Sequence, residues 1–239
     1  MDRFAICIIL ACFLVIPSPS KAQGIFHGGM YGTMGMPTAE MKRSIFGEKN
    51  FPGLGGGFNV LVNPKGRGLF SPVHLGAEFN YIYLGKEKID ASPTYPPLKT
   101  NYNFVTVGPI IRYFPFEKEE GFTPFFDGGF GWKILSTSTQ FDDTLLETII
   151  NGEEAVQLMS TKFGGIGLNL GVGFFNRQLP KEGEPNTASF YMKILYQYGD
   201  TINFVERGSI KVDNLGNFSY QTGRTKTSMI ILQMGLALH

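Results

Sequence analysis

The stretch IGLNLGVGF, residues 166–174, decides the fold, because large apolar residues alternate with glycine and one asparagine along its whole length. A period of two places all the apolar side chains on one face of a β-strand. Residues 190–198 (FYMKILYQY) and 230–238 (IILQMGLAL) repeat the pattern, with Lys193, Gln197 and Gln233 on the opposite face. These segments predict strands with one apolar face and one face that is polar or small.

Five further segments have the same character and are bounded by Pro, Asn, Asp and Gly. Several of them exceed the roughly 9 to 11 residues that a tilted strand uses to cross a bilayer, so we expect their ends to stand clear of the hydrocarbon. The eight predicted strands lie near 24 to 35, 53 to 63, 72 to 84, 100 to 114, 123 to 137, 160 to 176, 187 to 200 and 225 to 239.

An apolar row opposite polar and glycine positions suits a barrel with lipid outside and a crowded polar interior. A soluble β-sandwich, or a soluble barrel, would place large apolar groups inside and charges outside. The sequence therefore predicts an all-β fold, an antiparallel up-and-down eight-stranded transmembrane β-barrel, and favours it over the soluble alternatives.

The lengths of the connections agree with this fold. Short connections follow the second, fourth and sixth strands, at residues 63–71, 115–122 and 178–186, whereas the other connections are longer. Short periplasmic turns and long external loops are typical of outer-membrane barrels, and an even number of strands returns both termini to the periplasm.

Residues 1–22 are predicted to be a cleaved signal peptide, with the barrel domain at 23–239. Asp2 and Arg3 precede an apolar run over 4–16, and Ser20-Lys21-Ala22 provides small residues for cleavage. The run is shorter than the roughly 20 residues of a membrane-spanning helix. Lipidation at Cys12 is the alternative, although the apolar run continues past that cysteine.

Cysteine usage and charge exclude several kinds of site. Both cysteines, Cys7 and Cys12, lie in the predicted signal, so disulfides and thiolate metal sites are not expected in the mature chain. Removing Arg3, Lys21 and Asp2 from 21 basic and 20 acidic residues leaves 19 of each. A chain without basic excess is not expected to bind nucleic acid.

With these strands, turns and signal, the chain resembles the small eight-stranded outer-membrane β-barrel families, which include OmpX and the transmembrane domain of OmpA. The resemblance covers nearly all of residues 24–239, and it is one of architecture and not of a unique motif. It implies a porin-like barrel in the outer membrane of a Gram-negative cell envelope.

Inward-facing charges are predicted from the same alternation. We expect them to pair into a network, because an eight-stranded lumen is only wide enough to be filled by side chains. A proton or ion path is the functional alternative. The predicted lumen network consists of Glu78, Arg112, Asp127, Lys133 and Lys193, beside Asn59, Asn80, Asn169, Gln197 and Gln233.

No catalytic, metal or cofactor site is predicted. A surface hydrolase generally needs a base near the external rim, yet His27, His74 and His239 fall toward the periplasmic ends of their strands. The first and third strands are not neighbours, which argues against a metal bound by His27 and His74. The glycine clusters lack the spacing of a nucleotide-binding loop.

The best remaining place for function is the external connections. The connection after the fifth strand has Asn151-Gly152, a strong hairpin signal, at its centre, and counting outward from it is expected to pair the fifth and sixth strands in register. A short helix is the alternative, since Thr144 and Glu147 have capping-box spacing. The candidate interaction surface comprises Asp142, Asp143, Glu147, Asn151, Gly152, Glu153 and Glu154.

The last connection has a similar pattern, with Ile210, Val212, Phe218 and Tyr220 flanking the turn-like residues 213–216. Prolonged hairpins would present strand edges to another protein, whereas the plain alternative is a solvated loop.

These features predict a non-enzymatic outer-membrane protein with a structural, adhesive or complex-forming role. Its partners would be outer-membrane lipid and a protein bound at the loops or in an envelope assembly. The alternatives are a narrow passive channel and, with less support, a lipid-modifying enzyme.

Overall fold

The computed structural model describes residues 26–46, 52–66, 71–91, 97–116, 121–141, 157–177, 188–213 and 217–238. The predicted signal peptide and the acidic residues between 142 and 156 lie outside these ranges.

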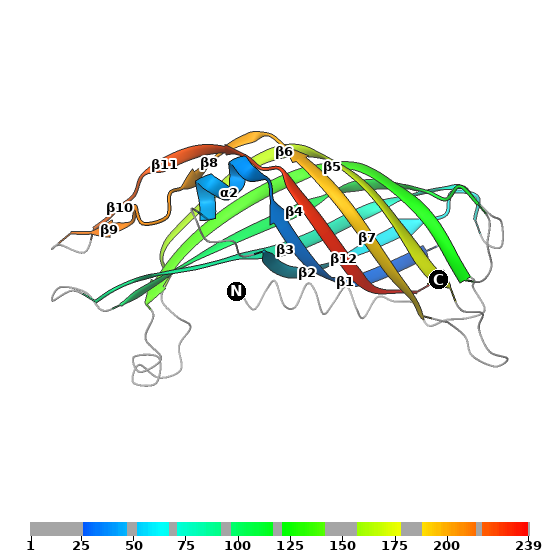
Figure 1. The fold of residues 1–239 in the computed structure, drawn as a ribbon, viewed down its shortest axis with the longest axis horizontal. Coiled ribbons are helices and arrows are strands. Elements are labelled where there is room, and N and C mark those ends of the chain that lie inside the picture. The colour runs from blue at the N-terminus through cyan, green and yellow to red at the C-terminus, as the bar shows by residue number, and fades with distance from the viewer. Residues whose placement is uncertain are drawn as a thin grey trace.

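Eight antiparallel strands close into a barrel, which confirms the predicted fold class (Figure 1). Each strand pairs with the next one around the wall, and the first pairs with the last, with Gly28 opposite Leu238. The strands are β1 (Phe26–Pro37), β2 (Gly53–Val62), β3 (Val73–Ile89), β4 (Leu98–Tyr113), β5 (Gly121–Phe141), β6 (Gln157–Arg177), β7 (Ala188–Gly199) and β12 (Met229–Leu238).

An apolar band surrounds the barrel wall, as the period-two pattern predicts. On β6, for example, Ile166, Leu168 and Leu170 are exposed while Asn169 between them is buried. Exposed apolar side chains on a closed barrel are the expected surface toward lipid. The other strands contribute Met30, Met36, Leu54, Phe58, Val60, Leu75, Tyr81, Val107, Ile111, Tyr113, Phe122, Phe126, Phe130, Trp132, Phe190, Ile194, Tyr196, Tyr198, Ile230, Met234 and Leu236.

Four consecutive strands are much longer than the rest. β5 and β6 have 21 residues each, β3 has 17 and β4 has 16, whereas β1, β2, β7 and β12 have 10 to 12. A bilayer takes up roughly 9 to 11 residues of a tilted strand. The outer parts of β3 to β6 therefore form a four-stranded sheet beyond the band, which extends away from the barrel in Figure 1.

The last long connection forms a separate ribbon. β8 (Thr201–Val205) pairs with β11 (Thr222–Lys226), and β9 (Lys211–Val212) pairs with β10 (Phe218–Ser219). The predicted strand at 225–239 is thus two strands that are interrupted at Thr227 and Ser228. The break is held in place because the Thr227 backbone N–H donates to the Asp200 carbonyl oxygen at 3.2 Å.

A helix, α2 (Ala39–Phe46), lies between β1 and β2 and was not predicted. Its signals are nevertheless local: the Lys42 N–H donates to the Thr38 carbonyl oxygen at 2.8 Å, and Glu40 occupies the first turn, where the helix dipole favours an acid. Met41 and Ile45, one turn apart, are both buried. Among the described residues, no helix has the length and apolar character needed to cross a membrane.

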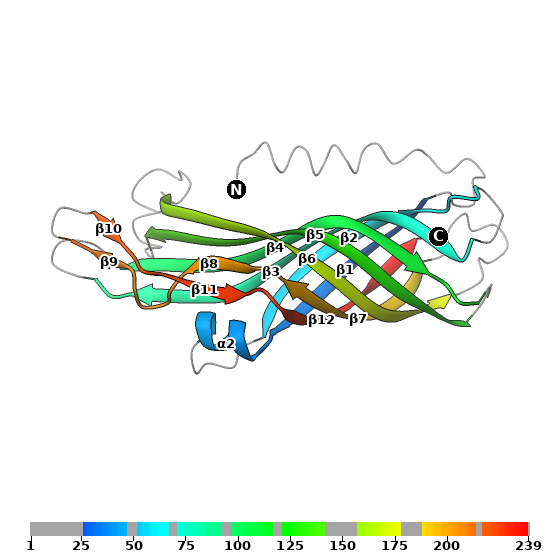
Figure 2. The same ribbon diagram turned by 90° about the horizontal axis from the view of Figure 1, so that it is seen from above.

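The start of β1, the end of β12 and the strand ends that the short connections join lie at one end of the barrel (Figure 2). The outer parts of the long strands, α2 and the ribbon lie at the other end. Short turns face the periplasm in barrels of this class, so we assign the extended end to the outside of the cell.

The expected register of β5 and β6 is wrong. A two-residue turn at Asn151-Gly152 would place Gln140 opposite Phe163, but Gln140 pairs with Gln157 and Phe163 pairs with Leu135. Along β5 and β6, a residue that faces lipid must lie opposite another that faces lipid, and a residue that faces the lumen opposite another that faces the lumen. This requirement outweighs a local turn preference.

Candidate functional site

Four of the five predicted lumen charges lie in direct contact. The Arg112 Nε and Nη2 atoms donate to the two Asp127 carboxylate oxygens at 2.7 and 2.8 Å. Lys193 Nζ donates to Glu78 Oε1 at 2.7 Å and to Asp127 Oδ2 at 2.9 Å. Two acids and two bases balance, so the mutual attraction of the four charges offsets the cost of removing each of them from water.

The predicted Asn59 and three aromatic residues that sequence reasoning missed, Tyr31, Phe125 and Tyr191, complete this network. The Tyr31 hydroxyl donates to Glu78 Oε1 at 3.0 Å, and Asn59 Nδ2 donates to the Tyr191 hydroxyl at 3.4 Å. The Arg112 guanidinium lies 4.0 Å from the centre of the Phe125 ring. Aromatic residues at inward positions were the available signal, since inward tyrosines require hydrogen-bonding partners.

Lys133 does not join the network, contrary to the prediction. Its Nζ donates to the Tyr198 carbonyl oxygen at 2.7 Å. Lys133 lies six residues beyond Asp127 on β5, about 20 Å along an extended strand, which is too far for contact. Its side chain runs across Gly167 and Gly199, where a Cβ atom would collide with it.

Below the charged network, an aromatic cluster fills the periplasmic end of the lumen. The Phe125 and Phe175 ring centres are 4.9 Å apart, and Phe114 lies beside both. The His74 ring is 4.9 Å from that of Phe114. The cluster consists of Tyr31, Phe114, Phe125, Phe175, Tyr191 and Ala237.

The two described histidines meet, although they lie on strands that are not neighbours. The His27 and His74 rings stack with their centres 4.8 Å apart. Contrary to expectation, strands that are not neighbours do not keep the two histidines apart, because inward side chains reach one another across a narrow lumen. Within the described parts of the chain, no group of three or more His, Cys, Asp or Glu could hold a metal ion.

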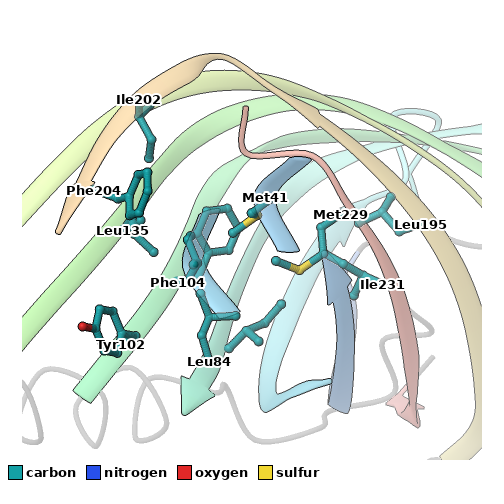
Figure 3. Packing of buried hydrophobic residues seen from close by; sticks show 12 residues of the cluster. Met41, Leu84, Tyr102, Phe104, Leu135, Leu195, Ile202, Phe204, Met229 and Ile231 are labelled. Carbon is teal, nitrogen blue, oxygen red and sulfur yellow. The ribbon is translucent and has the colours of Figure 1, made fainter. Parts of the chain in front are cut away.

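At the outer end of the lumen the interior is apolar, which corrects the expectation of a polar lumen throughout (Figure 3). Met41 and Ile45 of α2 cover the mouth, and Phe204 of the ribbon packs beside them. Burying each such side chain contributes about 1.5 to 3 kcal/mol. The rest of the cluster is Ile82, Leu84, Tyr102, Phe104, Leu135, Leu195, Ile202, Met229 and Ile231.

A polar layer separates the two apolar ends. Gln197 and Gln233 are buried on the inner wall, and Thr33 Oγ1 donates to Asn80 Oδ1 at 2.9 Å. The described lumen therefore has aromatic packing at its periplasmic end, then charges, then amides, then an apolar cap.

In the extracellular part, a polar group connects the long sheet with the ribbon. The Tyr102 hydroxyl donates to Glu87 Oε2 at 2.9 Å, and the Arg207 guanidinium lies 4.5 Å from the centre of the Tyr102 ring. Burial, with the adjacent Glu87 charge, raises the pKa of the Tyr102 hydroxyl, and burial lowers the pKa of Arg207. Tyr102 is consequently a neutral donor at every physiological pH.

The outer part of β6 has an open edge. Its partner β7 pairs with it only from Gly167 onward, at Gly199. From Gln157 to Gly165, β5 is the only described strand that pairs with β6, although Ile202 of β8 lies against Gly165 at the inner end of this stretch. A strand edge of this length carries unpaired N–H and C=O groups that can accept a further strand.

No protein-family model matches the chain, and no curated protein matches it. Several solved structures match it in fold. A major outer membrane protein from Thermus thermophilus is 14% identical with a TM-score of 0.51, covering 90% of this chain and 98% of that one. Neisserial surface protein A is 8% identical with a TM-score of 0.48, over 90% and 96% of the two chains. The outer membrane protein OprG from Pseudomonas aeruginosa is 13% identical with a TM-score of 0.46, over 91% and 96%.

At these identities the likeness concerns the fold, and the lipid-facing band is a property of this chain's own surface. The likeness of fold and the lipid-facing band agree, and the chain is a closed eight-stranded antiparallel β-barrel of the outer-membrane type.

Proposed function

We propose that the protein is a non-enzymatic component of the outer membrane that binds another protein through its extracellular sheet, in an adhesive or complex-forming role. The observation that carries this proposal is the open edge of β6 from Gln157 to Gly165. A partner would add a strand there, with main-chain hydrogen bonds supplying affinity.

The sheet is well suited to present this edge. Its inner face is fastened to the ribbon by Tyr102 and Arg207, and Arg207 Nη2 also donates to the Leu84 carbonyl oxygen at 3.0 Å. A rigid edge loses little conformational entropy on binding. The acidic residues 142–154, which lie outside the described ranges, belong to the same proposed surface.

A passive channel has less support. Packed aromatic residues occupy the periplasmic end and the apolar cluster under α2 occupies the outer end, so ions would meet a low-dielectric barrier at both.

Proline substitution at two successive positions tests the edge. In an antiparallel pair, successive residues direct their N–H groups alternately toward the partner strand and away from it. Of Ser160→Pro and Thr161→Pro, one therefore removes a free edge donor while the other breaks a bond to β5. We expect the edge-directed proline to abolish co-purification of a companion protein from gently solubilised outer membranes, while Ser160→Ala retains it.

Hydrogen exchange of β5 identifies which proline leaves the β5–β6 ladder intact. If that variant retains the companion protein in full, or if wild-type barrels purify alone after cross-linking in the membrane, the proposal of edge pairing is wrong.

A further inference from the structure

The outer face of the long sheet is basic where it leaves the lipid band. The outward positions above the band are Lys86 and Lys88 on β3, Lys99, Asn101 and Asn103 on β4, Ser136, Ser138 and Gln140 on β5, and Ser160 and Lys162 on β6. Four of these ten positions are lysine and none is acidic, and the exposed Asp90, which directly follows β3, is the one described acid that continues the row of Lys86 and Lys88.

The register brings the lysines into neighbouring rows. Lys88 lies directly opposite Lys99, and Lys86 lies opposite Asn101. Like charges directly opposite each other on one face of a sheet are destabilising. Lys88 has an interaction of its own, so it is not counted among the cations that remain to be neutralised. Across the described chain, no ion pair joins Lys86, Lys99 or Lys162 to an acid.

The position of this face relative to the lipid band indicates its occupant. Lys162 is four residues beyond Ile166, the last exposed apolar residue of β6, which is about 13 Å along an extended strand. Tyr81 and Tyr83 mark the same boundary on β3, and the Tyr81 hydroxyl donates to Asn103 Oδ1 at 2.7 Å. Tyrosines and lysines in this order are typical of a wall that passes from acyl chains into headgroups.

We infer that the outer face of β3 to β6 binds the phosphate groups of outer-leaflet glycolipid, with Lys86, Lys99 and Lys162 as the cationic contacts and the Asn and Ser side chains as hydrogen-bond donors. Charge complementarity and direct continuity with the lipid-facing band carry the inference. It rests on residence in the membrane and is independent of edge pairing by β6.

The test measures lipid retained by the full-length barrel. Native mass spectrometry in mild detergent would count molecules of bisphosphorylated lipid A bound to the wild type and to the triple variant Lys86→Gln, Lys99→Gln, Lys162→Gln. The matched control removes three positive charges from the opposite side of the extracellular part, with Lys42→Gln, Arg224→Gln and Lys226→Gln.

We expect binding to weaken on the order of a hundredfold in the sheet-face variant, since each basic residue near an anionic surface contributes several-fold, and to change little in the control. The wild-type protein should bind dephosphorylated lipid A more weakly than bisphosphorylated lipid A by a similar factor. Emission from Trp132 and a β-sheet circular dichroism spectrum verify folding of each variant.

Equal retention by the two triple variants would overturn the inference, because the site would then not be this face. Equal binding of dephosphorylated lipid would overturn it as well, because the contact would then be apolar. Preference of this face for a soluble anionic polysaccharide over lipid A would contradict the assignment to lipid.

Discussion

At the scale of single residues, Asp127 accepts the most hydrogen bonds within the buried charged network. It accepts two hydrogen bonds from Arg112 and one from Lys193, while Glu78 shares the same lysine. Replacing both partners of such a pair with apolar groups can be tolerated, but removing one partner leaves an uncompensated buried charge.

Asp127→Ala should therefore destabilise the barrel by about 3 to 5 kcal/mol, because Arg112 would lose its paired carboxylate and Lys193 one of two acceptors. Urea unfolding in lipid vesicles, followed by the emission of the single tryptophan, Trp132, measures the change. Asp90→Ala, at an exposed position, is the matched control and should be neutral within about 0.5 kcal/mol. A loss below about 1 kcal/mol for Asp127→Ala would show that the network contributes little.

At the scale of elements, α2 closes the outer mouth. Its buried side chains, Met41 and Ile45, pack into the cluster that joins β3, β4, β8 and β12, so a short helix with few turns of its own gains its stability from tertiary contacts.

Ile45→Ala should loosen this cap by about 2 to 5 kcal/mol while leaving the membrane part of the barrel folded. Hydrogen exchange by mass spectrometry should show faster exchange in α2 and β11 and unchanged exchange in β1 and β7. Glu40→Gln, on the exposed side of the helix, is the control and should alter exchange only slightly. Uniform acceleration over the whole barrel would mean that α2 and the barrel unfold as one unit.

At the scale of the whole molecule, the barrel combines a lipid-facing band, a packed lumen and an asymmetric extracellular extension. Only one half of the wall, β3 to β6, continues beyond the band as a sheet, and the ribbon of β8 and β11 packs against it through Ile202 and Phe204. Both of the proposed binding surfaces therefore lie outside the lumen.

Planar-bilayer recordings of the wild-type protein should accordingly show no steady conductance, because both ends of the lumen are filled by apolar side chains. Phe114→Ala alone should also remain closed, since the outer cluster would still block the path. Long-lived open steps of the wild type, reproducible across preparations, would restore the channel as the better hypothesis.

The sequence alone determined the eight strands, their inward and outward faces and the alternation of short and long connections. These features depend on a period of two and on turn residues, which are local properties. The inward positions of Glu78, Arg112, Asp127, Lys133 and Lys193 followed from the same alternation.

Tertiary structure alone decided which inward groups touch. Lys193 and Glu78 are 115 residues apart, and their contact depends on the closure and the stagger of the barrel. The stacking of His27 on His74 and the separation of Lys133 from the charged network depend on the same two properties. The cap under α2 and the basic face of β3 to β6 likewise combine residues from strands whose register no local pattern specifies.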